Sequence, residues 1–119
     1  MRFLFFDTET TGVSHQDHIV QLGAVLTNDK GKILGEMDMI VKPDGYAIPK
    51  GATAVHGIST QKAIEEGERL ENVLGRFLLL VEQSDCLVAH NMDFDRRFVN
   101  AAFGRLENWD AISLSLIHI

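Results

Sequence analysis

Two carboxylates near the start of the chain are the residues best suited to chemistry. Asp7 and Glu9 follow an apolar run in the segment Phe5-Phe6-Asp7-Thr8-Glu9-Thr10-Thr11-Gly12. We expect residues 2–6 to form a strand that is buried on both faces and ends near Asp7. Side chains two positions apart on a strand point to the same face, so the two carboxylates converge. Because like charges held together are costly and hard divalent cations prefer carboxylate oxygens, the pair predicts a metal site.

A second acidic segment lies late in the chain, in His90-Asn91-Met92-Asp93-Phe94-Asp95. Here a short buried strand over 87–89 should give way to a helix over 93–106. Acids in the first turn of a helix complement its dipole, which accounts for Asp93 but less well for Asp95 at the border of the core. Strand ends beside helix starts are also where ligands bind in open sheets. If strand 87–89 pairs in parallel with the first strand, Asp95 joins Asp7 and Glu9 around one metal-sized space.

The remaining pattern predicts a mixed-sheet α/β layer fold. Alternating and apolar runs indicate strands over 19–27 and 33–41, joined by a turn at 28–32. Ser59 or Thr60 is suited to cap a short helical turn. Apolar residues at helical spacing indicate a helix over 68–82 with one buried face. The expected order is a three-strand meander followed by a helix, a strand and a helix.

Size and charge limit the function classes. A chain of 119 residues with a formal charge of −6 is one domain, and it is not the basic type that binds nucleic acid nonspecifically. It can still act on a nucleic-acid end, because bound divalent ions reverse the local sign of an acidic cluster. The lone cysteine, Cys86, indicates a buried reduced thiol. With no apolar run of membrane-spanning length and no signal peptide, we expect a cytoplasmic protein that does not bind membranes.

Three segments in order resemble the signatures of the DEDD-type 3′–5′ exonucleases, in their DEDDh form. They are Phe6–Gly12, Val55-His56-Gly57-Ile58 and His90–Asp95, and the resemblance extends over residues 2–106. The chain is most similar to the proofreading epsilon subunit of bacterial DNA polymerase III and its stand-alone relatives. The resemblance implies an RNase H-like fold.

The same resemblance implies a site with two Mg²⁺ or Mn²⁺ ions about 3.5–4 Å apart. Asp7 would bridge both ions, and Glu9 and Asp95 would complete their ligand shells, which makes these three the catalytic and metal-binding residues. The implied substrate-binding residues are Thr8, Thr10, His56, Asn91 and Phe94. The threonines would line the terminal nucleotide site, His56 would lie near the 3′ end, and Asn91 and Phe94 would support the site and wedge against the terminal bases.

Taken without the resemblance, several of these residues have simpler interpretations. His56 is then a satisfied loop histidine, and Thr10 is a turn residue. A solvated helix face is a simpler role for Arg96 and Arg97 than phosphate contact. The histidines of the first polar loop, His15 and His18, are expected to be exposed to solvent. His90 and Asn91 are suited to capping the following helix.

The resemblance stops near residue 110. The family also has a fourth carboxylate and a general-base histidine, with the histidine five positions before the acid. Neither Asp110 nor His118 fits that pattern. We therefore expect residues 1–110 to be the N-terminal part of an exonuclease domain, C-terminally truncated so that its final strand and helices are missing. We expect residues 111–119 to be an atypical tail, with a non-native gene end as one explanation. One face of the sheet would then be uncovered.

The expected function is metal-dependent 3′–5′ exonuclease action on DNA or RNA, releasing nucleoside monophosphates. Loss of a general base alone costs about 10²–10⁴-fold in rate, so we expect this polypeptide to be weakly active or inactive. The expected partners are DNA or RNA 3′ ends, with a DNA polymerase subunit as a candidate. The alternative is a non-catalytic domain that binds nucleic-acid ends or a partner protein.

Overall fold

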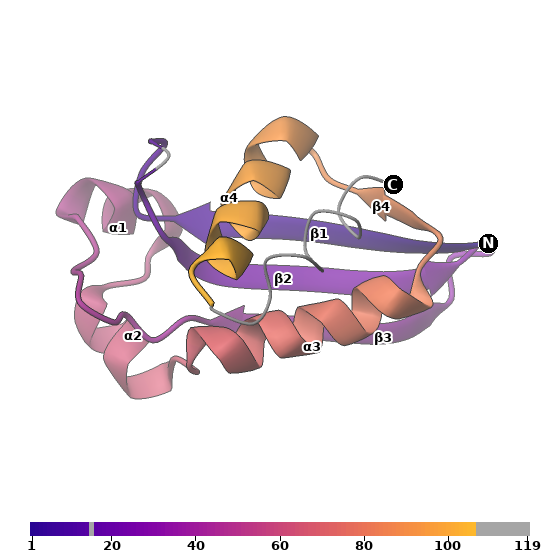
Figure 1. Cartoon of the computed structure of the whole chain (residues 1–119), viewed down its shortest axis with the longest axis horizontal. Helices are drawn as coiled ribbons and strands as arrows, with labels where there is room; N and C mark the ends of the chain where they lie inside the picture. The colour runs from indigo at the N-terminus through magenta and orange to yellow at the C-terminus, as the bar shows by residue number, and fades with distance from the viewer. Residues whose placement is uncertain (15, 107–119) are drawn as a thin grey trace.

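A computed structural model of the chain describes residues 1–14 and 16–106, and shows a mixed sheet with two long helices across one face (Figure 1). The strands have the spatial order β3-β2-β1-β4. This arrangement confirms the predicted α/β fold and element order. His15, Asp110, His118 and the predicted tail over 111–119 lie outside the described residues. The elements are β1 (Arg2–Thr10), β2 (Ile19–Asn28), β3 (Ile33–Ile40), α1 (Lys50–His56), α2 (Thr60–Glu66), α3 (Leu70–Gln83), β4 (Cys86–Val88) and α4 (Met92–Gly104).

The sheet combines an antiparallel meander with one parallel strand. β1 pairs antiparallel with β2, and β2 pairs antiparallel with β3 at the sheet edge. β4 pairs in parallel with β1, with Phe3 opposite Cys86 and Phe5 opposite Val88. A parallel neighbour needs a long crossover, which the segment containing α3 provides. The predicted parallel pairing is therefore confirmed, and it brings the start of α4 alongside β1.

The main core lies between the sheet and the two long helices. α3 buries the stripe that its spacing predicts, with Phe77 completely buried against Phe6 at a ring-centroid distance of 5.4 Å. α4 adds Phe98 and Phe103 to the same core. In Figure 1 both helices lie in front of the sheet, on the face that carries Leu4 and Phe6.

α1 and α2 lie at one end of the sheet, away from the N-terminus (Figure 1). Ser59 caps α2 as predicted, since its hydroxyl accepts a hydrogen bond from the Lys62 N–H at 3.1 Å. Gly57 ends α1 with a φ of 78°, a left-handed conformation that glycine adopts without steric cost. This end has its own small apolar cluster, made of Val20, Ile48, Ile58 and Ala63.

The expectation that β1 ends near Asp7 and is buried on both faces was wrong. β1 continues to Thr10, with a register shift between Glu9 and Thr10. One set of alternating side chains is buried, whereas Phe5 on the other face is 46% exposed. The reason is that α3 and α4 both pack against the same face. Within residues 1–14 and 16–106, no helix is long and apolar enough to cross a membrane.

The adjacent residues Phe5 and Phe6 provide a matched test of this one-sided packing. Phe6→Ala opens a cavity under α3, so we expect the free energy of unfolding to fall by about 3–5 kcal/mol. Phe5→Ala removes a partly exposed ring and is expected to cost about 1 kcal/mol or less. Urea unfolding followed by circular dichroism measures both values. Equal costs for the two substitutions would contradict the arrangement.

Candidate active site

Asp95 is the buried acid of the site. It lies in the first turn of α4, and its side chain is only 2% exposed. Its Oδ1 accepts a hydrogen bond from the Thr8 hydroxyl at 2.6 Å and a longer one from the Thr8 N–H at 3.3 Å. The parallel pairing of β4 with β1 makes this contact possible. The predicted parallel pairing therefore brings Asp95 to β1, where its direct partner is Thr8.

The electrostatics of this carboxyl indicate a local shortage of positive charge. Burial raises the pKa of Asp95, and the negative charge of nearby Asp7 raises it further. The hydrogen bonds from Thr8 act in the opposite direction and lower the pKa, but they do not cancel the effect of burial. The charge of Asp7 is thus close enough to make ionisation of Asp95 less favourable.

Asp7 and Glu9 lie on the opposite side of β1 from the Thr8 side chain. They open into a groove of about 720 Å³ on the exposed face of the sheet. Asp7 is opposite Gly23 of β2, so no partner side chain covers it there. Glu36 and Asp38 of β3 also line the groove, and its lining, which lies wholly in the described residues, includes no Lys, Arg or His. The groove is therefore acidic.

The expected single cluster of Asp7, Glu9 and Asp95 is not formed. Among residues 1–14 and 16–106, no three His, Cys, Asp or Glu side chains are grouped so that they could hold a metal ion. The physical reason is strand alternation: Asp7 and Glu9 project to one face of β1, whereas Asp95 is bonded to Thr8 on the other. The assignment of these three residues as metal ligands remains a prediction.

The donor chemistry nevertheless fits a divalent cation. Asp7 and Asp95 offer hard carboxylate oxygens, and a cation near both would offset the effect of the Asp7 charge on Asp95. Glu9 is half-buried on β1, the strand that also carries Asp7, and offers a further carboxylate.

His56 links α1 to the end of β1. Its Nδ1 accepts a hydrogen bond from the Ile58 N–H at 3.1 Å, and its Nε2 lies 3.2 Å from the Thr10 carbonyl oxygen. Because Nδ1 accepts, Nε2 carries the proton and donates to Thr10. His56 is the last residue of α1 rather than a loop residue, but both of its ring nitrogens are satisfied, as the interpretation without the resemblance expects. Its predicted place near the 3′ end remains a prediction.

The other predicted substrate-binding residues lie around the same strand end. The Thr8 side chain is buried and bonded to Asp95, and the Thr10 hydroxyl donates to the Gly12 carbonyl oxygen at 2.7 Å. Asn91 is exposed at the N-cap of α4, where its side chain makes no capping hydrogen bond. Phe94 is half-buried beside Asp95. Their contacts with substrate remain predictions.

Two contacts were missed by the sequence-based interpretation. His18, expected to be exposed, is half-buried and stacks on Tyr46 with a centroid distance of 3.9 Å. Burial and the charge of Arg105 lower the His18 pKa. Arg97, expected on a solvated face, is exposed but donates to the Val13 carbonyl oxygen at 3.1 Å. No local pattern marks these contacts, because their partners are distant in sequence.

Comparison with known proteins shows a consistent set of similarities. A family model described as exonuclease, RNase_T, matches residues 4–113. The chain is 40% identical over 98 residues to a PolC-type DNA polymerase III of Thermotoga petrophila, covering 82% of this chain and 7% of the relative. It is 35% identical over 102 residues to the DNA polymerase III subunit epsilon of Treponema pallidum. That match covers 83% of this chain and 45% of the relative.

Solved structures agree with this similarity. The crystal structure of Escherichia coli exonuclease I in complex with a dA16 oligonucleotide has a TM-score of 0.79 to the chain at 28% sequence identity. The match covers 87% of this chain and 24% of exonuclease I. The chain thus spans less than half the length of these relatives.

The raised pKa of Asp95 predicts a specific pH dependence of stability. The folded state binds the proton more tightly than the unfolded state, so stability is lost as the pH rises above the usual carboxyl value of 3.8. Asp95→Asn cannot ionise and escapes this loss. The free energy of unfolding of the variant should therefore rise relative to wild type with increasing pH, as measured by urea unfolding.

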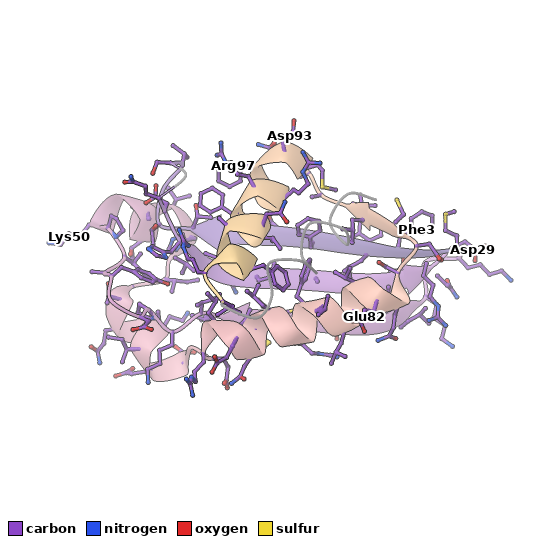
Figure 2. All side chains as sticks on the ribbon, viewed as in Figure 1. Phe3, Asp29, Lys50, Glu82, Asp93 and Arg97 are labelled. Carbon is purple, nitrogen blue, oxygen red and sulfur yellow. The ribbon has the colours of Figure 1, made fainter. Side chains whose placement is uncertain are left out.

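The matched control is Asp93→Asn, which changes an exposed carboxyl on the same helical turn. In Figure 2 Asp93 projects outward from the start of α4. A relative gain of equal size in both variants would show that the effect does not come from burial of Asp95.

Proposed function

Because the chain belongs to the RNase_T exonuclease family, we propose that it carries part of the active site of a metal-dependent 3′–5′ exonuclease. The reaction is hydrolysis of the terminal phosphodiester bond of a nucleic acid, with release of a nucleoside monophosphate. One observation carries the proposal: the parallel pairing of β4 with β1 sets the buried Asp95 against Thr8, the neighbour of Asp7, where the charge of Asp7 raises the pKa of Asp95.

Divalent cations are the cofactor that this arrangement suits. Asp7, Glu9 and Asp95 would hold one or two Mg²⁺ or Mn²⁺ ions. When bound, such ions stabilise charge on the phosphoryl oxygens and lower the pKa of a bound water. They also solve an electrostatic problem, because a polyanion is repelled by an acidic groove on a chain of charge −6 until cations reverse the local sign.

The chain's own residues orient this site. The Thr8 hydroxyl holds one oxygen of Asp95, so it fixes the direction in which that carboxylate can act. His56 holds the Thr10 carbonyl oxygen and thereby the end of β1. Phe94, half-buried next to Asp95, offers a ring on which a terminal base can stack, a contact that tolerates any base.

The relatives indicate which substrate and partner to test first. The exonuclease I structure contains a dA16 oligonucleotide, and the PolC-type and epsilon relatives are named as DNA polymerase III proteins. We therefore propose DNA 3′ ends as the substrate, with RNA 3′ ends as the comparison. A DNA polymerase subunit is the proposed protein partner.

A second candidate function is binding of a nucleic-acid end without cleavage. One observation favours it: the described residues do not group three ligands for a metal ion. We expect cleavage by the 119-residue chain to be slow.

Exonuclease action is tested on single-stranded DNA labelled at its 5′ end, with Mg²⁺ and the 119-residue chain. We expect slow, stepwise shortening from the 3′ end that stops when EDTA removes the metal. Asp7→Asn should lower the rate at least about a hundredfold, because a bound cation stabilises the transition state by several kcal/mol. The control is Asp29→Asn, the same change of charge at the opposite end of the sheet from α1 (Figure 2).

Fluorescence anisotropy of the same DNA separates the two candidate functions. Binding that Asp7→Asn leaves intact, without any shortening, identifies an end-binding domain. Neither binding nor shortening at any Mg²⁺ or Mn²⁺ concentration would contradict both functions.

A further inference from the structure

The segment that follows β1 is held in shape by hydrogen bonds to the side chain of Asp17. This post-strand segment, Thr11–Ser14, is braced by Asp17, whose Oδ1 accepts from the Thr11 hydroxyl and whose Oδ2 accepts from the Ser14 N–H, both at 2.9 Å. The Thr11 N–H donates to the His18 carbonyl oxygen, also at 2.9 Å. The segment continues directly from Thr10, at the end of the strand that carries Asp7 and Glu9.

The post-strand segment and Asp17 together form a turn. Two arginines of the α4 region attach this turn to the helix. Arg97 Nη2 donates to the Val13 carbonyl oxygen, and Arg105 Nη2 donates to the Asp17 carbonyl oxygen, each at 3.1 Å. The two arginines are about two helical turns apart, so they hold the turn at separate points. Figure 2 shows Arg97 on α4, the helix that also carries Asp95.

Arg97 makes a further contact that Arg105 does not share. Its guanidinium carbon lies 5.7 Å from the ring centroid of Phe94 and 5.6 Å from that of Phe98. The two rings are themselves 4.7 Å apart. A planar guanidinium can stack on aromatic faces while it donates hydrogen bonds from its edge, which an ammonium group cannot do. One side chain therefore joins the Phe94 ring to the post-strand segment.

We infer that Arg97 is a positioning residue that fixes the Phe94 ring against the post-strand segment, so that the stacking surface for the terminal base is formed before substrate binds. This inference rests on the proposed function for the role of Phe94. It needs both properties of Arg97, the hydrogen bond to Val13 and the planar contact with Phe94. Charge alone is insufficient, which distinguishes this role from attraction of a phosphate.

Substrate binding is measured with a single-stranded DNA that carries 2-aminopurine at its 3′ end, with Ca²⁺ in place of Mg²⁺. Stacking on Phe94 should quench this base in the wild-type chain, and Phe94→Leu should abolish the quenching. Arg97→Met and Arg97→Lys should both lose most of the quenching and bind about tenfold more weakly, since each removes the stacked fork. Arg105→Met, which loosens the turn without touching Phe94, should weaken binding less than about twofold.

Amide hydrogen exchange of the chain without DNA gives an independent measure. Exchange of the Thr11 amide should be about tenfold faster in Arg97→Met, because loss of one hydrogen bond loosens the turn. Exchange of the Leu22 amide, in the middle of β2, should not change and so reports that the variant is folded.

The outcomes separate the inference from the proposed function. Wild-type affinity and quenching in Arg97→Lys would overturn the positioning role and leave a charge effect. Absence of DNA binding by the wild-type chain would count against the proposed function and the stacking role together. In that case unchanged Thr11 exchange in Arg97→Met would also overturn the attachment of the turn to α4.

Discussion

The hydrogen bond between the Thr8 hydroxyl and the Asp95 carboxylate joins parts of the chain that are 87 residues apart, and the candidate site depends on it. It exists because β4 lies parallel to β1 and delivers the first turn of α4 to the strand. A carboxyl that is 2% exposed is costly unless its oxygens are satisfied, and Thr8 satisfies one of them twice. The same burial leaves the pKa of Asp95 raised. Stability and chemistry are therefore linked at one contact.

The site uses both sides of β1. Asp95 approaches from the packed side, whereas Asp7 and Glu9 face the acidic groove on the open side. This division explains why the charge of Asp7 acts on Asp95 although the described residues form no ready metal cluster. In the proposed function, a bound cation would offset both the burial of Asp95 and its repulsion by Asp7. The family membership shown by residues 4–113 gives this electrostatic arrangement its chemical context.

Around the acids, the structure is organised by contacts that hold backbone carbonyl oxygens. His56 holds the carbonyl of Thr10, and Arg97 holds that of Val13. These donors come from two helices that are far apart in the sequence, α1 and α4. The end of β1 and the segment after it are therefore each held by a helix before any ligand is present. Such a preformed frame reduces the conformational entropy lost on binding.

The sequence by itself determined the types and order of the elements, because helix and strand periodicities are local properties of neighbouring residues. The sequence also predicted the parallel pairing that brings Asp95 to β1. Its choice of Asp7, Glu9 and Asp95 as metal ligands remains a prediction. Only the tertiary structure decided that β1 has an exposed face at Phe5, that Thr8 uses its hydroxyl on Asp95, and that the three acids do not converge. The reason is that the direction of a side chain depends on which helix packs on which face. The partners of His18 and Arg97 were likewise decided by long-range packing, which leaves no periodic pattern in the sequence.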